Sequence, residues 1–176
     1  MKSWPLWIAG TLVLAVIVHI MIILGMPYAI MDRAMSRIAV AGATNIALHA
    51  PRADALARGM KRPSPELLYS ACVFDLSKQP LRITSPVPDS YWSLSLFAAN
   101  TDNFFVLNDR QAGAARVDVI LAMDGQNVPE RANQGHAPVI IAPSEMGIIL
   151  FRTLITSEDR LADLDQLRRK ARCTPL

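Results

Sequence analysis

The chain has 176 residues, 52% of them hydrophobic and 19% charged, and a formal net charge of +3. A charge this small, carried mostly by scattered basic residues, gives no reason to expect a nucleic-acid partner. Beyond the first 41 residues about 135 remain, which is enough for one globular domain and too few for two.

The N-terminal segment is apolar over residues 4–26 and contains no Asp, Glu, Lys or Arg. A bilayer core about 30 Å thick is crossed by about 20 apolar residues in a helix. Aromatic residues flank the segment, with Trp4 and Trp7 at one end and Tyr28 at the other, where rings favour the headgroup level. Residues 1–27 are therefore predicted to form a transmembrane signal-anchor.

A cleaved signal peptide is the alternative interpretation of this segment. Its apolar region would run about 7–15 residues and end close to a small-residue cleavage site. Here the apolar run is longer, and the one suitable site, Ala39-Val40-Ala41, lies well beyond it. The pattern favours an anchor that stays attached. Charge leaves its orientation open, because Lys2 on one side is opposed by Arg33 and Arg37 on the other.

Residues 28–42 are predicted to form a second, amphipathic helix next to the membrane. Pro27 precedes this segment and is expected to kink or end the first helix. Ile30, Ala34 and Ile38 then recur every four residues, which places them on one face of a helix. This apolar face would lie on the membrane or on the domain that follows.

From residue 43 onward the pattern changes to the alternation typical of β-strands. Turns rich in Pro, Asn, Asp and Gly separate the alternating runs, and a βαβ order is absent, which excludes a Rossmann-type fold. We predict a mainly β (α+β) domain over residues 43–176, an antiparallel sheet or sandwich that follows the N-terminal transmembrane helix and ends in a C-terminal helix. The predicted strands are residues 45–49, 67–76, 81–85, 91–98, 104–108, 116–123, 139–142 and 147–155.

The C-terminal helix is predicted from its start signal and its leucines. Thr156 and Asp159 have the spacing of a capping box. Three leucines at helical spacing over residues 161–167 are expected to pack on the sheet. The basic cluster at residues 168–172 is interpreted as a helix end that complements its own dipole.

The sequence contains no short motif of known chemistry, such as a phosphate-binding glycine loop, a zinc motif or a nucleophile elbow. No metal or cofactor is therefore predicted. The weak catalytic candidates are His49, Glu66 and Asp75, although His49 before Pro51 is interpreted first as a structural hydrogen-bonding residue. His19, near the middle of the membrane segment, is either a neutral residue that faces a partner helix or part of a proton path.

The two cysteines, Cys72 and Cys173, allow one disulfide. Cys72 lies on a predicted central strand and Cys173 in the C-terminal tail. A bond between them would close a loop of about 100 residues and pin the terminal helix to the sheet. The alternative is two unpaired thiols, one of them a small core residue.

Six short sequence elements along the chain, taken together, form a pattern that is typical of one protein family. They are Asn45 with His49-Ala50-Pro51-Arg52; Pro63-Ser64-Pro65-Glu66-Leu67-Leu68-Tyr69-Ser70; Phe74-Asp75-Leu76-Ser77 with Pro80-Leu81; Asp89-Ser90-Tyr91-Trp92-Ser93; Asn100-Thr101-Asp102-Asn103-Phe104; and Ala142-Pro143-Ser144 with Gly147-Ile148-Ile149-Leu150-Phe151-Arg152. Together they resemble the domain-of-unknown-function family 1254, and in particular its short bacterial branch of integral membrane proteins.

This resemblance implies a mainly β fold and no assigned reaction. Longer relatives carry Asn and Asp in the element where this chain has Ser64, Glu66 and Leu67, so no binding role is carried over to that loop. In longer relatives a second domain, of family 1214, follows on the same chain. This sequence has no such domain, so the resemblance implies a separate membrane-anchored partner that carries it.

We therefore expect a single-pass protein of the bacterial inner membrane whose C-terminal domain lies in the periplasm. The domain would act as a binding or assembly component for a co-anchored partner, whose effective concentration the anchor raises. The alternative is an envelope hydrolase or glycan-acting enzyme that uses His49, Glu66 and Asp75. Transport by the chain alone is not expected with one membrane span.

Overall fold

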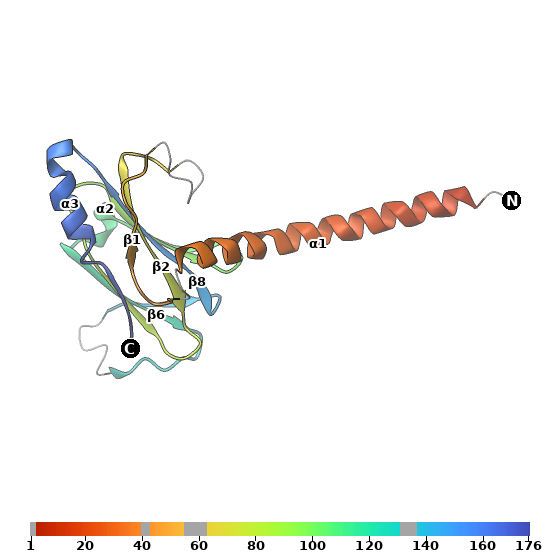
Figure 1. Cartoon of the computed structure of the whole chain (residues 1–176). Helices are drawn as coiled ribbons and strands as arrows, with labels where there is room; N and C mark the ends of the chain where they lie inside the picture. The colour runs from red at the N-terminus through yellow and green to blue at the C-terminus, as the bar shows by residue number, and fades with distance from the viewer. Residues whose placement is uncertain (1–2, 40–42, 55–62, 131–136) are drawn as a thin grey trace.

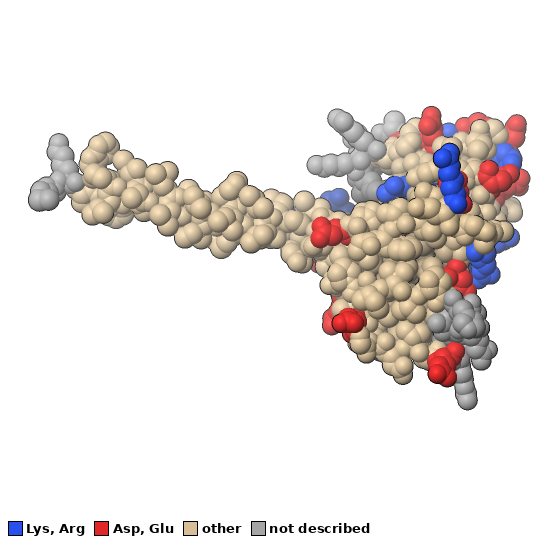
Figure 2. Space-filling view, turned by 180° about the vertical axis from the view of Figure 1, so that it is seen from behind, with Lys and Arg blue, Asp and Glu red and all other residues tan. Residues whose placement is uncertain are grey.

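The computed structural model describes residues 3–39, 43–54, 63–130 and 137–176. Within them a long helix precedes two β-sheets and a short terminal helix (Figure 1). Helix α1 (Trp4–Ile38) has 35 residues, which is about 52 Å at the usual rise per residue. In the described part of the chain it is the one helix long and apolar enough to cross a bilayer or to serve as a signal sequence. Its outer part projects from the domain without charged side chains in the view of Figure 2.

The first sheet, sheet A, has five strands that all pair antiparallel. Two of its inner strands, β2 (Leu67–Asp75) and β8 (Met146–Leu154), are nine residues each and pair along their full length. Long central strands with apolar residues on both faces are typical of a sheet covered on both sides. In spatial order the strands are β1 (Leu48–His49), β2 (Leu67–Asp75), β8 (Met146–Leu154), β4 (Trp92–Ala98) and β5 (Asn103–Asn108).

The second sheet, sheet B, has four strands and packs against sheet A. Strand β3 (Leu81–Pro86) pairs antiparallel with both β6 (Arg116–Met123) and β9 (Arg172–Pro175). Strand β6 also pairs with β7 (Val139–Ala142), and this pair is parallel. The parallel pair and strand β9 are two features that the sequence did not predict. In spatial order the strands are β7 (Val139–Ala142), β6 (Arg116–Met123), β3 (Leu81–Pro86) and β9 (Arg172–Pro175).

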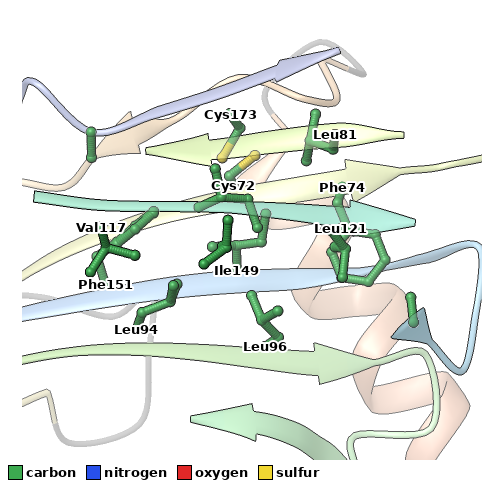
Figure 3. Close-up of a cluster of buried hydrophobic side chains, with 14 of the residues drawn as sticks. Cys72, Phe74, Leu81, Leu94, Leu96, Val117, Leu121, Ile149, Phe151 and Cys173 are labelled. Carbon is green, nitrogen blue, oxygen red and sulfur yellow. The ribbon is translucent and has the colours of Figure 1, made fainter. Parts of the chain in front are cut away.

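The hydrophobic core lies between the two sheets (Figure 3). Alternation along each strand sends every second side chain inward, and these side chains are almost completely buried. The structure therefore confirms the predicted mainly β domain, in its sandwich form. The core side chains include Cys72, Phe74, Leu94, Leu96, Ile149 and Phe151 from sheet A and Leu81, Ile83, Val117, Val119, Leu121 and Cys173 from sheet B.

Helix α1 continues through Pro27 and meets the outer face of sheet A at strands β2 and β8. The sequence predicted a kink or a helix end here, since proline removes one helix hydrogen bond. Instead, Pro27, Ala34 and Ile38 are half-buried and Met31 is buried, at spacings that place them on one face of the helix. We call these four residues the docking stripe. Packing of this stripe supplies contacts that hold the helix beyond the proline, whereas Ile30, predicted on the same face, is exposed.

The two short helices of the domain, α2 (Asp109–Ala112) and α3 (Leu161–Arg168), begin in different ways. Helix α2 (Asp109–Ala112) begins with a capping box in which Asn108 and Gln111 exchange side-chain and backbone hydrogen bonds. Before helix α3 (Leu161–Arg168) a short 3-10 turn, η3 (Glu158–Arg160), replaces the capping box predicted at Thr156. The residue before η3 makes no side-chain cap. Leu164 of α3 is buried, as its spacing predicted.

Candidate functional site

His49, the first catalytic candidate, lies on the short edge strand β1 opposite Ser70 of β2. Its Nδ1 is 2.9 Å from the Ser70 hydroxyl oxygen. The same hydroxyl oxygen accepts a hydrogen bond from the Arg168 guanidinium at 3.2 Å. A hydroxyl that accepts from Arg168 can donate its own proton to Nδ1, which suits a neutral imidazole. The arrangement gives His49 the hydrogen-bonding role that the sequence favoured.

Arg168 connects the terminal helix to the edge of sheet A from a buried position. Its guanidinium donates to the backbone carbonyl of Tyr69 at 2.7 Å and to that of Ala50 at 2.7 Å. Its Nε donates to Asp165 at 2.7 Å. Burial lowers the pKa of Arg168, which the hydrogen bond and charge of Asp165 oppose, and arginine remains a cation in proteins. Arg168 therefore stabilises the junction of β1, β2 and α3.

The pKa of His49 is lowered by burial and then by the positive charges of Arg168, Arg169 and Arg172, while Asp165 opposes the shift. A histidine whose folded-state pKa lies below 6.5 takes up a proton more readily when unfolded. Its contribution to stability is therefore complete above pH 6.5 and is lost as the pH falls through the folded-state pKa.

We predict that His49→Gln makes the free energy of unfolding depend less steeply on pH just below pH 6.5. One proton taken up on unfolding corresponds to a slope of at most about 1.4 kcal/mol per pH unit. Urea unfolding of the full chain in detergent at several pH values measures this slope. Carboxylates such as Asp165 titrate in a lower pH range, so they do not mask the effect. Equal slopes for the variant and the wild type would contradict the assignment.

An open hollow of about 370 Å³ lies beside this junction, between α3, η3 and the segment after β1. Its charged side chains are already paired. Arg52 donates to both oxygens of Glu158 at 2.8 and 2.9 Å, and Asp165 accepts from Arg168 and Arg169. Each of these three arginines contacts a carboxylate, and three cations against two carboxylates leave the hollow with a formal charge of only +1.

Glu66 and Asp75, the other catalytic candidates, lie at opposite ends of β2. Glu66 is exposed just before the strand, whereas Asp75 is its last residue. Nine strand residues span about 30 Å. The Asp75 carboxylate accepts a hydrogen bond from the backbone of Ser77 at 2.9 Å. The Ser77 side chain and then this backbone bond lower the pKa of Asp75, which is ordinary turn chemistry. The structure therefore does not bring His49, Glu66 and Asp75 together, and the described residues contain no cluster suited to a metal ion.

Cys72 and Cys173 do meet, across the two sheets. Both thiols are buried and unbonded, and their side chains lie against each other in the core (Figure 3). Burial raises the pKa of Cys173 well above its usual value, and the hydrogen bond with Cys72 raises it further. A thiol in this environment stays protonated and reacts slowly. The pair lies where a disulfide would link β2 to the last strand.

We predict that the chain carries a Cys72–Cys173 disulfide when it is isolated from an oxidising compartment. A closed loop of about 100 residues raises the free energy of unfolding by up to about 4.7 kcal/mol. Intact-mass analysis after denaturing alkylation, with and without reductant, detects the bond. Cys72→Ser, which cannot form the bond, is the control. Alkylation of both thiols without reductant would contradict the prediction.

The outer face of sheet A carries a row of polar side chains that the sequence did not single out. Directly paired positions run across four strands, from Tyr69 of β2 to Arg152 of β8, Ser93 of β4 and Asn108 of β5. Paired residues in antiparallel strands point to the same face. Their neighbours Leu94 and Phe151 point into the core, so these four residues, which we call the outer polar row, point away from it.

Two members of the outer polar row have no partner in the described part of the chain. Arg152 is half-buried on a central strand and makes no hydrogen bond or ion pair there. The Ser93 hydroxyl is buried and has no hydrogen-bond partner. Buried polar groups normally find a partner, so each such exception is informative.

The predicted candidate His19 is exposed on α1 and lies far from this row along the chain.

A family model described as "Protein of unknown function (DUF1254)" matches residues 44–175 of the chain. The match covers all the strands of the β-sandwich and ends at the last residue of strand β9. It agrees with the resemblance seen in the sequence. No curated protein matches the chain.

Solved structures also resemble the chain, and among them are the following two. The VPA0106 protein from Vibrio parahaemolyticus aligns with 85% of the chain at 14% identity and a TM-score of 0.62. An uncharacterized protein from Burkholderia cenocepacia aligns with 76% of the chain at 16% identity and a TM-score of 0.49. The chain spans 36% and 34% of the lengths of these proteins. The first likeness supports the β-sandwich fold.

Proposed function

Because the chain belongs to the DUF1254 family, whose function is unknown, we propose its role from its own surfaces: a membrane-anchored binding or assembly component. In this proposal α1 crosses the bacterial inner membrane once and remains attached. The β-sandwich lies on the periplasmic side and binds a second, co-anchored protein. That partner would carry a domain of the family-1214 type.

The observation that carries the proposal is the continuity of α1. Its first part, to Met26, exposes apolar side chains throughout, and its last part packs on sheet A through the docking stripe. An exposed apolar helix of this length is stable in a bilayer and not in water. Since one helix serves both parts, the domain is held at a short and fixed distance from the membrane surface. Anchoring of this kind favours pairing with another protein in the same plane.

The free edge of strand β7 supports the proposal of a protein partner. In the described residues β7 pairs with β6 alone, and its other edge has no strand beside it. Val139 and Ile141 on this strand are 42% and 51% exposed. An unpaired edge strand with exposed branched aliphatic residues is a template for adding a strand from another chain.

The test is co-purification of the full chain in mild detergent, with bound proteins identified by mass spectrometry. The expected partner has its own apolar helix and a domain of the family-1214 type. The double variant Val139→Lys and Ile141→Lys should reduce its recovery at least tenfold, because lysine on an edge strand opposes pairing. Val106→Lys is the matched control, since Val106 is 51% exposed on β5, an edge strand of the other sheet.

Recovery of no such protein with the wild type, or equal recovery with the double variant, would overturn the partner proposal. Orientation is tested separately. A reporter that is active only in the periplasm, joined by a flexible linker after Leu176, is expected to be active. Activity of a cytoplasm-specific reporter at the same position would overturn the localisation.

The enzyme alternative gains no support from the described residues. His49 makes its side-chain hydrogen bond with Ser70, and Glu66 and Asp75 lie at the two ends of β2. A catalytic pair of carboxylates needs the two groups within about 5–10 Å.

A further inference from the structure

We propose that the outer polar row of sheet A binds a phosphate group, with Arg152 as its cationic contact. Ser93 on one side of Arg152 and Tyr69 on the other would donate neutral hydrogen bonds, and Asn108 lies beyond Ser93. This site is separate from the β7 edge on sheet B, so it does not depend on the proposed protein partner.

Arg152 is the first reason. Arginine is rarely buried without a partner, and the other sheltered arginines of this domain have one. Arg168 contacts Asp165 and two backbone carbonyls, and Arg82 donates to Asp118 at 2.7 Å. Arg152 is half-buried in the middle of the sheet with no such partner among the described residues. An unmatched guanidinium at a fixed position on a rigid strand is suited to an external anion.

Ser93 is the second and independent reason. Its residue is 2% exposed and its hydroxyl has no hydrogen-bond partner. A buried hydroxyl without a partner destabilises a fold, so its presence needs an explanation. Ser93 is paired directly with Arg152, and adjacent strands lie about 4.8 Å apart. A ligand held by Arg152 would therefore lie directly beside Ser93.

The chemistry of the row selects the ligand. The Tyr69 hydroxyl accepts a hydrogen bond from the backbone of Ser64 at 3.1 Å, so its own proton is available to donate. The Asn108 carbonyl oxygen accepts from Gln111 at 2.9 Å, which leaves its amide as a donor. The row thus offers one cation and several neutral donors, and it contains no carboxylate. Several donors around one positive charge match a phosphate, which has more acceptor oxygens than a carboxylate.

The position of the row indicates two sources for the phosphate. It lies on the face of sheet A from which α1 projects, so that face looks along the helix toward the membrane (Figure 1). The phosphate could therefore belong to a lipid headgroup or to a soluble ion. The experiment below separates these sources.

The test uses the full chain in maltoside micelles, which contain no phosphate. Inorganic phosphate is titrated in one arm and short-chain phosphatidylglycerol in the other, and thermal unfolding is followed because a bound ligand stabilises the folded state. The titration with chloride at equal ionic strength corrects for screening. Arg152→Gln should weaken the binding of the stabilising probe roughly ten- to a hundredfold. Arg116→Gln removes the same charge from an exposed position on sheet B and should leave binding unchanged.

Ser93→Ala adds a result that a purely structural role would not give. Without ligand the variant should unfold at a higher temperature than the wild type, because an unpaired buried hydroxyl is removed. With ligand, its stabilisation should be smaller than that of the wild type. Stabilisation by phosphatidylglycerol alone identifies a lipid headgroup, and stabilisation by both probes identifies the phosphate group itself. No stabilisation of the wild type by either probe, or equal stabilisation of Arg152→Gln, would overturn the proposal.

Discussion

Gly147→Ala is expected to destabilise the domain by about 3 kcal/mol or more. A Cβ atom at this position would lie 2.1 Å from the backbone oxygen of Phe97 and 2.6 Å from the Phe74 ring. Gly147 is paired with residues of β2 and β4 at the centre of sheet A, so the neighbouring backbone cannot move without disturbing both strands. Urea unfolding of the full chain in detergent, followed by circular dichroism, measures the loss.

Gly10→Ala is the control for this substitution. An added Cβ at Gly10 meets no atom within 4 Å, because the residue lies in the exposed part of α1. Its unfolding midpoint should therefore match that of the wild type. If Gly147→Ala also unfolded at the wild-type midpoint, the close approach of β4 and β8 described above would be wrong.

Arg168→Ala is expected to cost about 3–5 kcal/mol, the usual effect of removing one partner of a buried ion pair. The substitution leaves the carbonyls of Tyr69 and Ala50 without their donors and removes one cation from Asp165. It also frees the end of α3 from sheet A. The same urea titration measures this change.

Arg169→Ala is the matched control for Arg168→Ala. Arg169 also donates to Asp165, at 2.7 Å, but its side chain is 53% exposed. Exposed ion pairs contribute little, so its loss should cost less than about 1 kcal/mol. Similar losses of stability for the two substitutions would contradict the role of Arg168 in stabilising the junction of β1, β2 and α3.

Most of the fold could be predicted from the sequence because alternation within each strand is a local signal. The nine residues of β2 and the eight of β6 agree with their predicted ranges to within one residue. Strand β9 was missed because Arg172–Pro175 is short, polar and follows a helix directly. Its pairing with β3, and the parallel pairing of β7 with β6, depend on contacts between distant segments. The continuity of α1 through Pro27 likewise depends on docking that only the folded domain supplies.

The candidate sites were harder to predict, since their residues acquire a role only through tertiary contacts. The basic cluster after α3 was interpreted as a helix end, yet Arg168 follows the buried Leu164 by four residues, a spacing that places both on one helix face. That spacing was an available signal. For the outer polar row, the strand pattern could show that Arg152 and Ser93 point outward. Their side-by-side arrangement required the register of β4 against β8.

The unbroken helix also fixes an angular relation between the membrane and the domain. Each helix residue turns by about 100°, so the face of α1 that carries His19 has a set direction relative to Met31 and sheet A. A second helix that packed on the membrane part would consequently set the direction in which sheet A faces. Deleting one residue between His19 and Met31 would rotate the domain by about 100° while leaving every contact inside it intact. The anchor thus fixes the rotation of the domain about the helix axis, and this rotation determines which surface of the domain faces neighbours in the membrane plane.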